Sequence, residues 1–405
     1  MIVLTAFEAI PGAGTEAGLA WNWGRSYVAA GHDVTVLTSA GAASHEQSEI
    51  WREAGIEVVY IGGIVAARAP QTPRDFVVVA GEIRSWVSGC RAWLETRAAD
   101  VTMVHHVSWG SVRLPPPFLK VNHPLTTVWG PLGGGQLAKF SGLLPKNRIH
   151  ELFRAASFPA AWLMRRIDFL SHRYPSLVLA TNSATLGYVK SLGIRAVGTM
   201  LADGIQPERI VPEPRNGFSA GTVNLIWLGR MVASKRPDIA LGLIADLHSK
   251  GVSASLTMIG DGPERSSLEV RAESLGVDHL VNFVGRVPWE RTFDYYDRSD
   301  FLVFTSMRDS SCPTVLEAAA RGVPTLCLRH QGVESMVPDS VAFGPTKFRS
   351  VKQLQDQLCE WIQYFRADTH RYELASRDAI DFAETQTWGR KVETVLNQVI
   401  GVRAS

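Results

Sequence analysis

The chain has 405 residues, more than one ordinary core needs and enough for two α/β domains. Its net charge of +2 gives no electrostatic reason to expect a nucleic-acid partner. The first five residues read as a strand and not as a signal peptide, and no run of about 18 apolar residues suggests a membrane span. The four cysteines form no CxxC pair, which is typical of reduced thiols in a cytoplasmic protein.

Short β-branched runs alternate with helical stretches along the whole chain. After the first strand, one series of predicted strands comprises residues 34–37, 58–61, 101–104, 126–128 and 177–180, and a second comprises 223–228, 254–259, 281–284, 301–304 and 325–328. Near-continuous apolar strands separated by helices favour parallel sheets covered on both faces. The sequence therefore predicts an α/β fold with two doubly wound, Rossmann-like domains.

A stretch rich in Pro and charged residues separates the two series and is typical of an interdomain linker. We expect a first domain at 1–206, a linker at 207–220 and a second domain at 221–380. Residues 381–405 carry helical spacing, and we expect a helix that packs back toward the first domain.

The first candidate site is the loop at 11–16, which follows strand 1 and precedes a predicted helix at 19–30. Gly12 and Gly14 allow a ligand to approach the backbone, and the helix N-terminus favours an anion. The third glycine of a dinucleotide fingerprint is missing, so a nicotinamide cofactor is not expected. Taken alone, this loop fits an ordinary strand-to-helix turn better.

The second candidate site lies at 228–237, where the first strand of the second series ends in glycine. Arg230 and Lys235 precede a helix that begins at Pro237. Two fixed cations at the carboxyl end of a strand can neutralise a diphosphate. The alternative is a pair of solvated loop charges.

The third candidate site is the segment 306–324, a polar loop that opens onto a predicted helix at 313–321. Asp309 and Glu317 flank the helix N-terminus, where unpaired N–H groups suit a phosphate. Their carboxylates can accept hydrogen bonds from sugar hydroxyls, as in a sugar-nucleotide pocket. The alternative is that Asp309 forms a turn and Glu317 is a solvated helix residue.

Two further segments of the first domain follow predicted strands. His105 and His106 are adjacent, so at most one faces a ligand and the other belongs to the core. Gly133 and Gly134 lie in a glycine-rich loop that either lines an acceptor site or forms a flexible turn. Metal ligands at typical spacing and a Gly-x-Ser-x-Gly hydrolase motif are both missing from the sequence.

The segment 146–174 mixes Arg, Lys and His with aromatic residues. It fits a basic amphipathic helix on an anionic membrane surface. The alternative is a helix hairpin with aromatic residues in the core and solvated arginines.

Several motifs occur together: the N-terminal glycine loop with 31–38, the segments 181–183, 203–205, 228–235, 259–263 and 283–287, and two acids that end at Glu317. In this combination the chain resembles the family 4 glycosyltransferases, which have the GT-B fold. The resemblance implies two Rossmann-like domains facing across a cleft. The second would hold a nucleotide-diphosphate sugar and the first the acceptor. It also implies transfer with retention of configuration and no metal or other cofactor.

The resemblance assigns roles to individual residues. The implied catalytic residues are His105, Arg230, Lys235 and Asp309. The implied donor-binding residues are Gly14, Arg230, Lys235, Gly260, Arg286, Val287, Asp309, Ser310, Ser311, Cys312, Thr314, Val315 and Glu317. The implied acceptor-side residues are Gly12, Glu16, His106, Gly133 and Gly134. Asp309 stands where the family usually has Glu, and Ser310–Ser311 replaces a Gly–aromatic pair.

The predicted function is transfer of a sugar from a UDP- or GDP-type donor to a hydroxyl of a glycan, glycolipid or small natural product. A GT-B sugar-nucleotide epimerase and a catalytically silent sugar-nucleotide-binding subunit are the alternatives. The expected location is the cytoplasm, with peripheral contact at the inner face of the membrane through 146–174.

Overall fold

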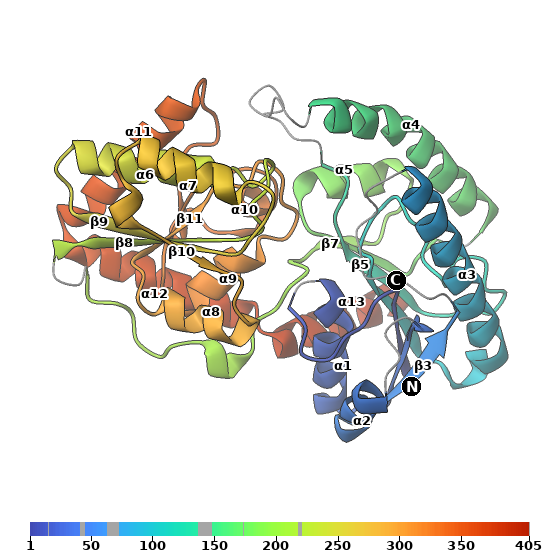
Figure 1. Cartoon of the computed structure of the whole chain (residues 1–405). Helices are drawn as coiled ribbons and strands as arrows, with labels where there is room; N and C mark the ends of the chain where they lie inside the picture. Colours follow the sequence, from blue (N-terminus) through green and yellow to red (C-terminus); the bar gives the residue numbers. More distant parts are fainter. Residues whose placement is uncertain are drawn as a thin grey trace. The chain divides into compact units, whose positions relative to one another are not determined.

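The computed structural model describes residues 1–404 apart from Thr15, 41–44, 63–72, 137–147, Arg173 and 218–220 (Figure 1). The chain divides into two compact units. The first contains Met1–Gln136, Ser157–Gly204 and Trp388–Ser405, and the second contains Leu137–Ala156 and Ile205–Thr387. No helix in the described residues is both long and apolar enough to cross a bilayer.

The first unit is built on a seven-stranded parallel sheet in the order β3-β2-β1-β4-β5-β6-β7. Its strands are β1 (Ile2–Ala6), β2 (Val34–Ser39), β3 (Ile56–Ile61), β4 (Met103–Ser108), β5 (Thr127–Leu132), β6 (Leu177–Ala180) and β7 (Val197–Thr199). The central strands are buried throughout because helices cover both faces of the sheet.

The helices of the first unit form two layers around this sheet. They are α1 (Leu19–Ala29), α2 (His45–Glu53), α3 (Pro73–Arg97), α4 (Arg148–Ser171, in this unit from Ser157 on), α5 (Ser183–Ser191) and α13 (Trp388–Ala404). One core cluster joins α1 and α13, where the rings of Trp23 and Trp388 lie 5.6 Å apart. The other cluster joins α3 and α5 on the opposite face. The C-terminal helix therefore completes the core of the first unit.

The second unit contains a six-stranded parallel sheet in the order β10-β9-β8-β11-β12-β13. Its strands are β8 (Val223–Leu228), β9 (Ala254–Ile259), β10 (Val281–Gly285), β11 (Phe301–Phe304), β12 (Thr325–Cys327) and β13 (Ala342–Phe343). Its helices are α6 (Pro237–Ser249), α7 (Arg265–Ser274), α8 (Trp289–Tyr296), α9 (Pro313–Ala320), α10 (Gln331–Met336), α11 (Val351–Arg366) and α12 (Thr369–Thr385). The predicted class, two Rossmann-like domains with parallel sheets, is confirmed.

The structure differs from the sequence prediction at short elements and boundaries. Strands β7 and β13 were not predicted, because runs of three and two residues carry too little periodicity. Helix α12 continues to Thr385 and α13 begins at Trp388, later than the predicted boundary after 380. Within the predicted linker, the Arg215 guanidinium donates to backbone carbonyls of the second unit, which anchors this stretch there.

The strand order places one switch point in each sheet. The chain order reverses between β1 and β4 in the first sheet, and between β8 and β11 in the second. Ligands of open α/β sheets bind outside the carboxyl ends of strands at such points. The candidate site residues are therefore expected at the ends of these four strands.

A substitution at Gly260, which directly follows β9, tests how closely these strand ends are packed. A Cβ at Gly260 would overlap the carbonyl oxygen of Gly229, and its φ is +117°. We expect Gly260→Ala to lower the free energy of unfolding by more than about 2 kcal/mol in urea denaturation. Gly251 (φ +70°) has open space around its Cβ position, so Gly251→Ala should cost only about 1 kcal/mol of backbone strain. Equal losses would contradict the steric explanation.

Candidate functional site

The loops that follow β8, β9 and β10 are held together through their backbones. The Gly229 N–H donates to Ile259 O at 3.0 Å, and the Gly260 N–H donates to Gly285 O at 2.8 Å. The Met231 N–H donates to Asp261 O at 2.9 Å. The absence of a side chain at Gly260, predicted to bind donor, is thus explained by close packing against Gly229.

Lys235 and Asp309 come together at the switch point of the second sheet. Lys235 Nζ forms an ion pair with Asp309 Oδ2. Lys235 lies between β8 and α6, and Asp309 lies between β11 and α9. The two connections are also joined by Met307 N–H donating to Ser234 O at 2.9 Å and by the Thr305 hydroxyl donating to Lys235 O at 2.8 Å. The Lys235 side chain is 33% exposed and that of Asp309 13%, so the cation stays accessible.

The carboxylate of Asp309 is surrounded by donors. Desolvation by burial raises its pKa, but Lys235 and the N–H groups of Cys312 (2.9 Å) and Ser311 (3.2 Å) outweigh this and hold the pKa below its usual range. The Asp309 N–H itself donates to Gln331 Oε1 at 2.9 Å. Asp309 is therefore an ionised acid fixed from both sides.

The same contacts occupy N–H groups at the N-terminus of α9, which were expected from the sequence to be unpaired and to suit a phosphate. The N–H groups of Ser311 and Cys312 already serve Asp309, and the Val315 N–H donates to Cys312 O at 3.0 Å. Cys312 and Val315 are fully buried, and Pro313 has no N–H. The N–H group of Val315 is thus occupied and its side chain lies in the core, and its donor-binding role stays a prediction.

Glu317 lies on α9 with both carboxylate oxygens engaged by α8. Trp289 Nε1 donates to Oε1 at 2.7 Å, and the Tyr296 hydroxyl donates to Oε2 at 3.0 Å. Burial, together with the charge and hydrogen bond of Glu317, raises the pKa of Tyr296, so it stays a neutral donor. The Arg209 guanidinium lies 5.7 Å from the Trp289 ring and 4.9 Å from the Phe293 ring. These contacts fix the orientation of Glu317.

The remaining predicted donor-binding residues differ in accessibility. Arg230 is exposed and has no salt bridge with any described residue. Arg286 is 80% exposed, with Nε 4.0 Å from Asp261 Oδ2. Val287, Ser310 and Thr314 are half-buried and Ser311 is buried.

Trp289, Tyr296 and Gln331 contact the two acids, and sequence reasoning missed all three. Tyr296 and Trp289 are helix residues spaced seven apart, which reads as an ordinary buried helix face. Gln331 is the first residue of α10 and has a φ of +53°. No local pattern connects any of them to an acid on another element.

In the first unit, most predicted acceptor-side residues meet at the switch point between β1 and β4. Glu16 Oε1 accepts from the Gly110 N–H at 2.9 Å, and the Gly133 N–H donates to Gly110 O at 2.7 Å. The Gly134 N–H donates to Gln136 Oε1 at 2.9 Å. Desolvation raises the pKa of Glu16, although the bond from Gly110 opposes this. Gly12 and Gly14 lie in the same β1–α1 connection as Glu16.

His105 and His106 point to opposite faces of the sheet, as expected, but neither is open to a ligand. His105 is fully buried, with Nδ1 3.0 Å from Tyr27 Oη and Nε2 2.7 Å from Gly130 O. His106 is 3% exposed, and its Nδ1 lies 2.9 Å from Thr5 Oγ1. Burial lowers the pKa to about 4 for His105 and to about 3 for His106, so both are neutral at pH 7.

The predicted catalytic role of His105 is therefore corrected. Both of its ring nitrogens are bonded inside the core, so it has none left for a substrate. The acceptor-side role predicted for His106 is corrected for the same reason of burial, because its ring packs toward Trp86 on α3.

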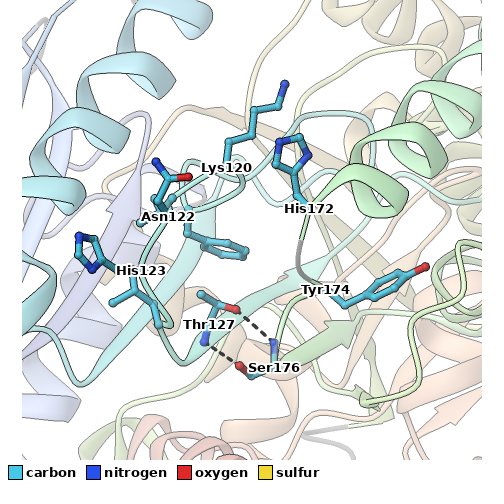
Figure 2. Close-up of a pocket in the computed structure, with 10 residues that line it drawn as sticks. Lys120, Asn122, His123, Thr127, His172, Tyr174 and Ser176 are labelled. Atoms are coloured by element: carbon cyan, nitrogen blue, oxygen red, sulfur yellow. Dashed lines mark hydrogen bonds between the residues drawn. The ribbon is translucent and has the colours of Figure 1, made fainter.

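A polar pocket of about 380 Å³ in the first unit lies at the opposite edge of the sheet (Figure 2). Thr127 begins β5 and Ser176 precedes β6, and each backbone N–H donates to the other's hydroxyl at 3.1 Å. Lys120, Asn122 and His172 surround this pair. Because these are the amino ends of the strands, this pocket is separate from the candidate site.

Comparison with known proteins gives a family match that lies within the second unit. Residues 214–374 match the family model described as glycosyl transferases group 1. A GDP-mannose-dependent alpha-(1-6)-phosphatidylinositol monomannoside mannosyltransferase of Mycobacterium tuberculosis is 25% identical over 295 residues, which are 66% of this chain and 75% of that protein. A 2-deoxystreptamine N-acetyl-D-glucosaminyltransferase of Streptomyces fradiae is 24% identical, over 64% of this chain and 63% of that protein.

Solved structures share the fold over the full length. Sucrose-phosphate synthase of Thermosynechococcus elongatus superimposes with a TM-score of 0.70 at 15% identity, covering 100% of this chain and 99% of its own. HepE of Anabaena, solved in complex with UDP and glucose, gives 0.61 at 13% identity, covering 98% and 99%.

The fold and these matches define a sugar-transferring enzyme of two Rossmann-like domains, the GT-B architecture. Residues 214–374 match the group 1 glycosyltransferases, and the relatives support the predicted family resemblance.

The lowered pKa of Asp309 makes the stability of the fold depend on pH. The ionised carboxylate stabilises the folded chain above the unfolded pKa of about 3.9, and this contribution is lost as pH falls through the lower folded pKa. We expect Asp309→Asn to be less stable than wild type at about pH 7, with the difference shrinking below about pH 4. Urea denaturation at both pH values, with the exposed Asp278→Asn as control, measures this. A difference that does not change with pH would contradict the ion-pair interpretation.

Proposed function

We propose that the enzyme transfers a sugar from a UDP- or GDP-type nucleotide-diphosphate sugar to a hydroxyl acceptor with retention of anomeric configuration. The observation that carries the proposal is the Lys235–Asp309 pair at the β8/β11 switch point. This pair lies inside the segment that matches the group 1 family. Because Lys235 stays one-third exposed, an incoming diphosphate can share its charge.

The proposed chemistry is stabilisation of charge without a covalent intermediate. As the bond between the sugar carbon and the phosphate oxygen breaks, negative charge grows on the diphosphate. Lys235 and the exposed Arg230 stabilise that charge. The departing phosphate oxygen takes the proton of the acceptor hydroxyl on the same face of the sugar, so configuration is retained. No histidine base is required, in accord with the burial of His105.

Asp309 and Glu317 have different proposed roles. Once a diphosphate competes for Lys235, Asp309 becomes free to accept hydrogen bonds from donor-sugar hydroxyls. Glu317, held by Trp289 and Tyr296, accepts from the ribose hydroxyls, as the family 4 resemblance implies. Since Arg230 and Lys235 supply the positive charge, we propose that transfer needs no metal ion.

The acceptor is proposed from the relatives. The Mycobacterium tuberculosis relative is named for transfer to a phosphatidylinositol monomannoside, and the Streptomyces fradiae relative for transfer to 2-deoxystreptamine. We place glycolipids first among glycans, glycolipids and small natural products. The four described cysteines are free and buried, which supports a reducing cytoplasmic location, with peripheral contact at the inner membrane face.

The first test is release of nucleotide diphosphate from a panel of UDP- and GDP-sugars with glycolipid and soluble acceptors, with and without a chelator. We expect release of nucleotide diphosphate that depends on the acceptor and that the chelator does not change. NMR should show that the transferred sugar has the same anomeric configuration in the product as in the donor. Lys235→Ala should lower kcat by roughly a hundredfold or more, because the cation that stabilises the negative charge of the leaving diphosphate is lost. Lys352→Ala, which removes a lysine with only surface ion pairs, is the matched control.

Three outcomes would contradict the proposal. Near-normal turnover by Lys235→Ala would remove the diphosphate role of this lysine. Conversion of a sugar nucleotide without acceptor would indicate an epimerase. Tight sugar-nucleotide binding without turnover would indicate a silent binding subunit.

The second test concerns the orientation of Glu317. Trp289→Phe removes the hydrogen bond to Oε1 and keeps an aromatic ring beside Phe293, whose centroid lies 5.2 Å away. We expect KM for the donor to rise roughly tenfold, with kcat and acceptor KM little changed, because a bond to a charged acceptor is lost. Trp361→Phe on α11 is the control. A fall in kcat with unchanged donor KM would contradict the positioning role.

A further inference from the structure

A second pocket of the first unit, distinct from the switch-point residues, has a volume of about 460 Å³. Residues of α3, the segment 113–120 and α4 line it (Figure 1). None of the predicted donor or acceptor residues lines it.

The charges of this pocket are strongly one-sided. The cations that line it are Arg84, Arg91, Arg113, Lys120 and Arg165, and its one carboxylate is Asp168. Asp168 Oδ2 lies 2.8 Å from Arg165 Nη1, and its Oδ1 lies 3.9 Å from Lys120 Nζ. Glu95, outside the lining, has Oε1 4.0 Å from Arg91 Nε, so two acids balance five cations, and this excess of positive charge favours an anionic occupant.

Arg165 gives the pocket a buried donor. Its side chain is 8% exposed, and its Nε has no hydrogen-bond partner among the described residues. Desolvation lowers the pKa of its guanidinium, which Asp168 opposes. A buried guanidinium with an unused N–H group is costly unless an anion accepts from it.

The rest of the lining is apolar and leads to an exposed apolar surface. The apolar residues that line the pocket are Ile83, Val87, Leu114, Pro115, Pro116, Leu119 and Met164. On α4, Leu163, Met164 and Ile167 are 53%, 54% and 53% exposed. Spaced at i, i+1 and i+4, they share one side of the helix. A ligand with an anionic head and an apolar body fits this combination.

We propose that this pocket binds the phosphate headgroup of an anionic phospholipid, while Leu163, Met164 and Ile167 enter the acyl region of the membrane. This deepens the peripheral contact within the proposed function and assigns it to a defined pocket. In the predicted basic amphipathic helix at 146–174, two of the arginines on the described part of α4 are engaged within the protein. There, Arg165 pairs with Asp168, and Arg166 donates to Leu192 O and Tyr174 Oη.

The test is co-sedimentation of the full chain with vesicles of phosphatidylcholine alone or with roughly one-third phosphatidylglycerol. We expect binding only to the anionic vesicles. The double variant Arg84→Gln/Arg91→Gln should weaken it roughly tenfold or more, because each lost cation near the surface weakens attraction to anionic lipid. Exposed arginines of the second unit provide the charge-matched control, Arg271→Gln/Arg298→Gln.

A second pair of variants tests the apolar contribution. Leu163→Ser/Ile167→Ser should weaken vesicle binding roughly tenfold or more, and Val270→Ser/Ile400→Ser, at two still more exposed residues, should not. Circular dichroism of each variant checks that the fold is kept.

Several outcomes would overturn the proposal. Equal loss in the pocket and control variants would show nonspecific attraction, and equal binding to neutral vesicles would exclude a phosphate headgroup. Release of the protein by inorganic phosphate, but not by sodium chloride of equal ionic strength, would identify a free small anion as the occupant. Donor turnover by the wild type with a soluble acceptor is measured in parallel, so failure of the proposed function is seen separately from failure of lipid binding.

Discussion

The ion pair between Lys235 and Asp309 is the interaction on which the proposed donor site depends. It joins the β8–α6 and β11–α9 connections at the point where the strand order of the second sheet reverses. The same carboxylate accepts from Ser311 and Cys312 and so shapes the start of α9. One acid thus fixes a cation, a loop and a helix N-terminus.

This arrangement accounts for the short acid at position 309. Asp309 is bonded simultaneously to Lys235 and to two backbone N–H groups two and three residues further along the chain. A carboxylate that bonds the backbone just ahead of it is the geometry that Asp favours, because its side chain is short. The acid proposed to contact the sugar is therefore also a structural part of its loop, as the turn-forming alternative described it.

Charge and burial are distributed differently in the two units. In the second unit, the proposed chemistry uses partly exposed groups held by neighbours, such as Lys235 by Asp309 and Glu317 by Trp289 and Tyr296. In the first unit, the histidines are buried and neutral, and the cationic side chains gather around a pocket between α3 and α4. The first unit thus has a basic surface feature that the transfer chemistry does not require.

The sequence by itself determined the class of fold, nearly all strands and the two loops that carry Lys235 and Asp309. These follow from local patterns: apolar runs, glycines at strand ends and a proline at the start of a helix. Only the tertiary structure decided which atoms are free. In the folded chain, both ring nitrogens of His105 are hydrogen-bonded inside the core, and the Val315 N–H is hydrogen-bonded within the start of α9. Trp289 contacts Glu317, and Gln331 contacts Asp309. Burial and hydrogen-bond partners depend on elements far apart in the chain, and no local pattern encodes them.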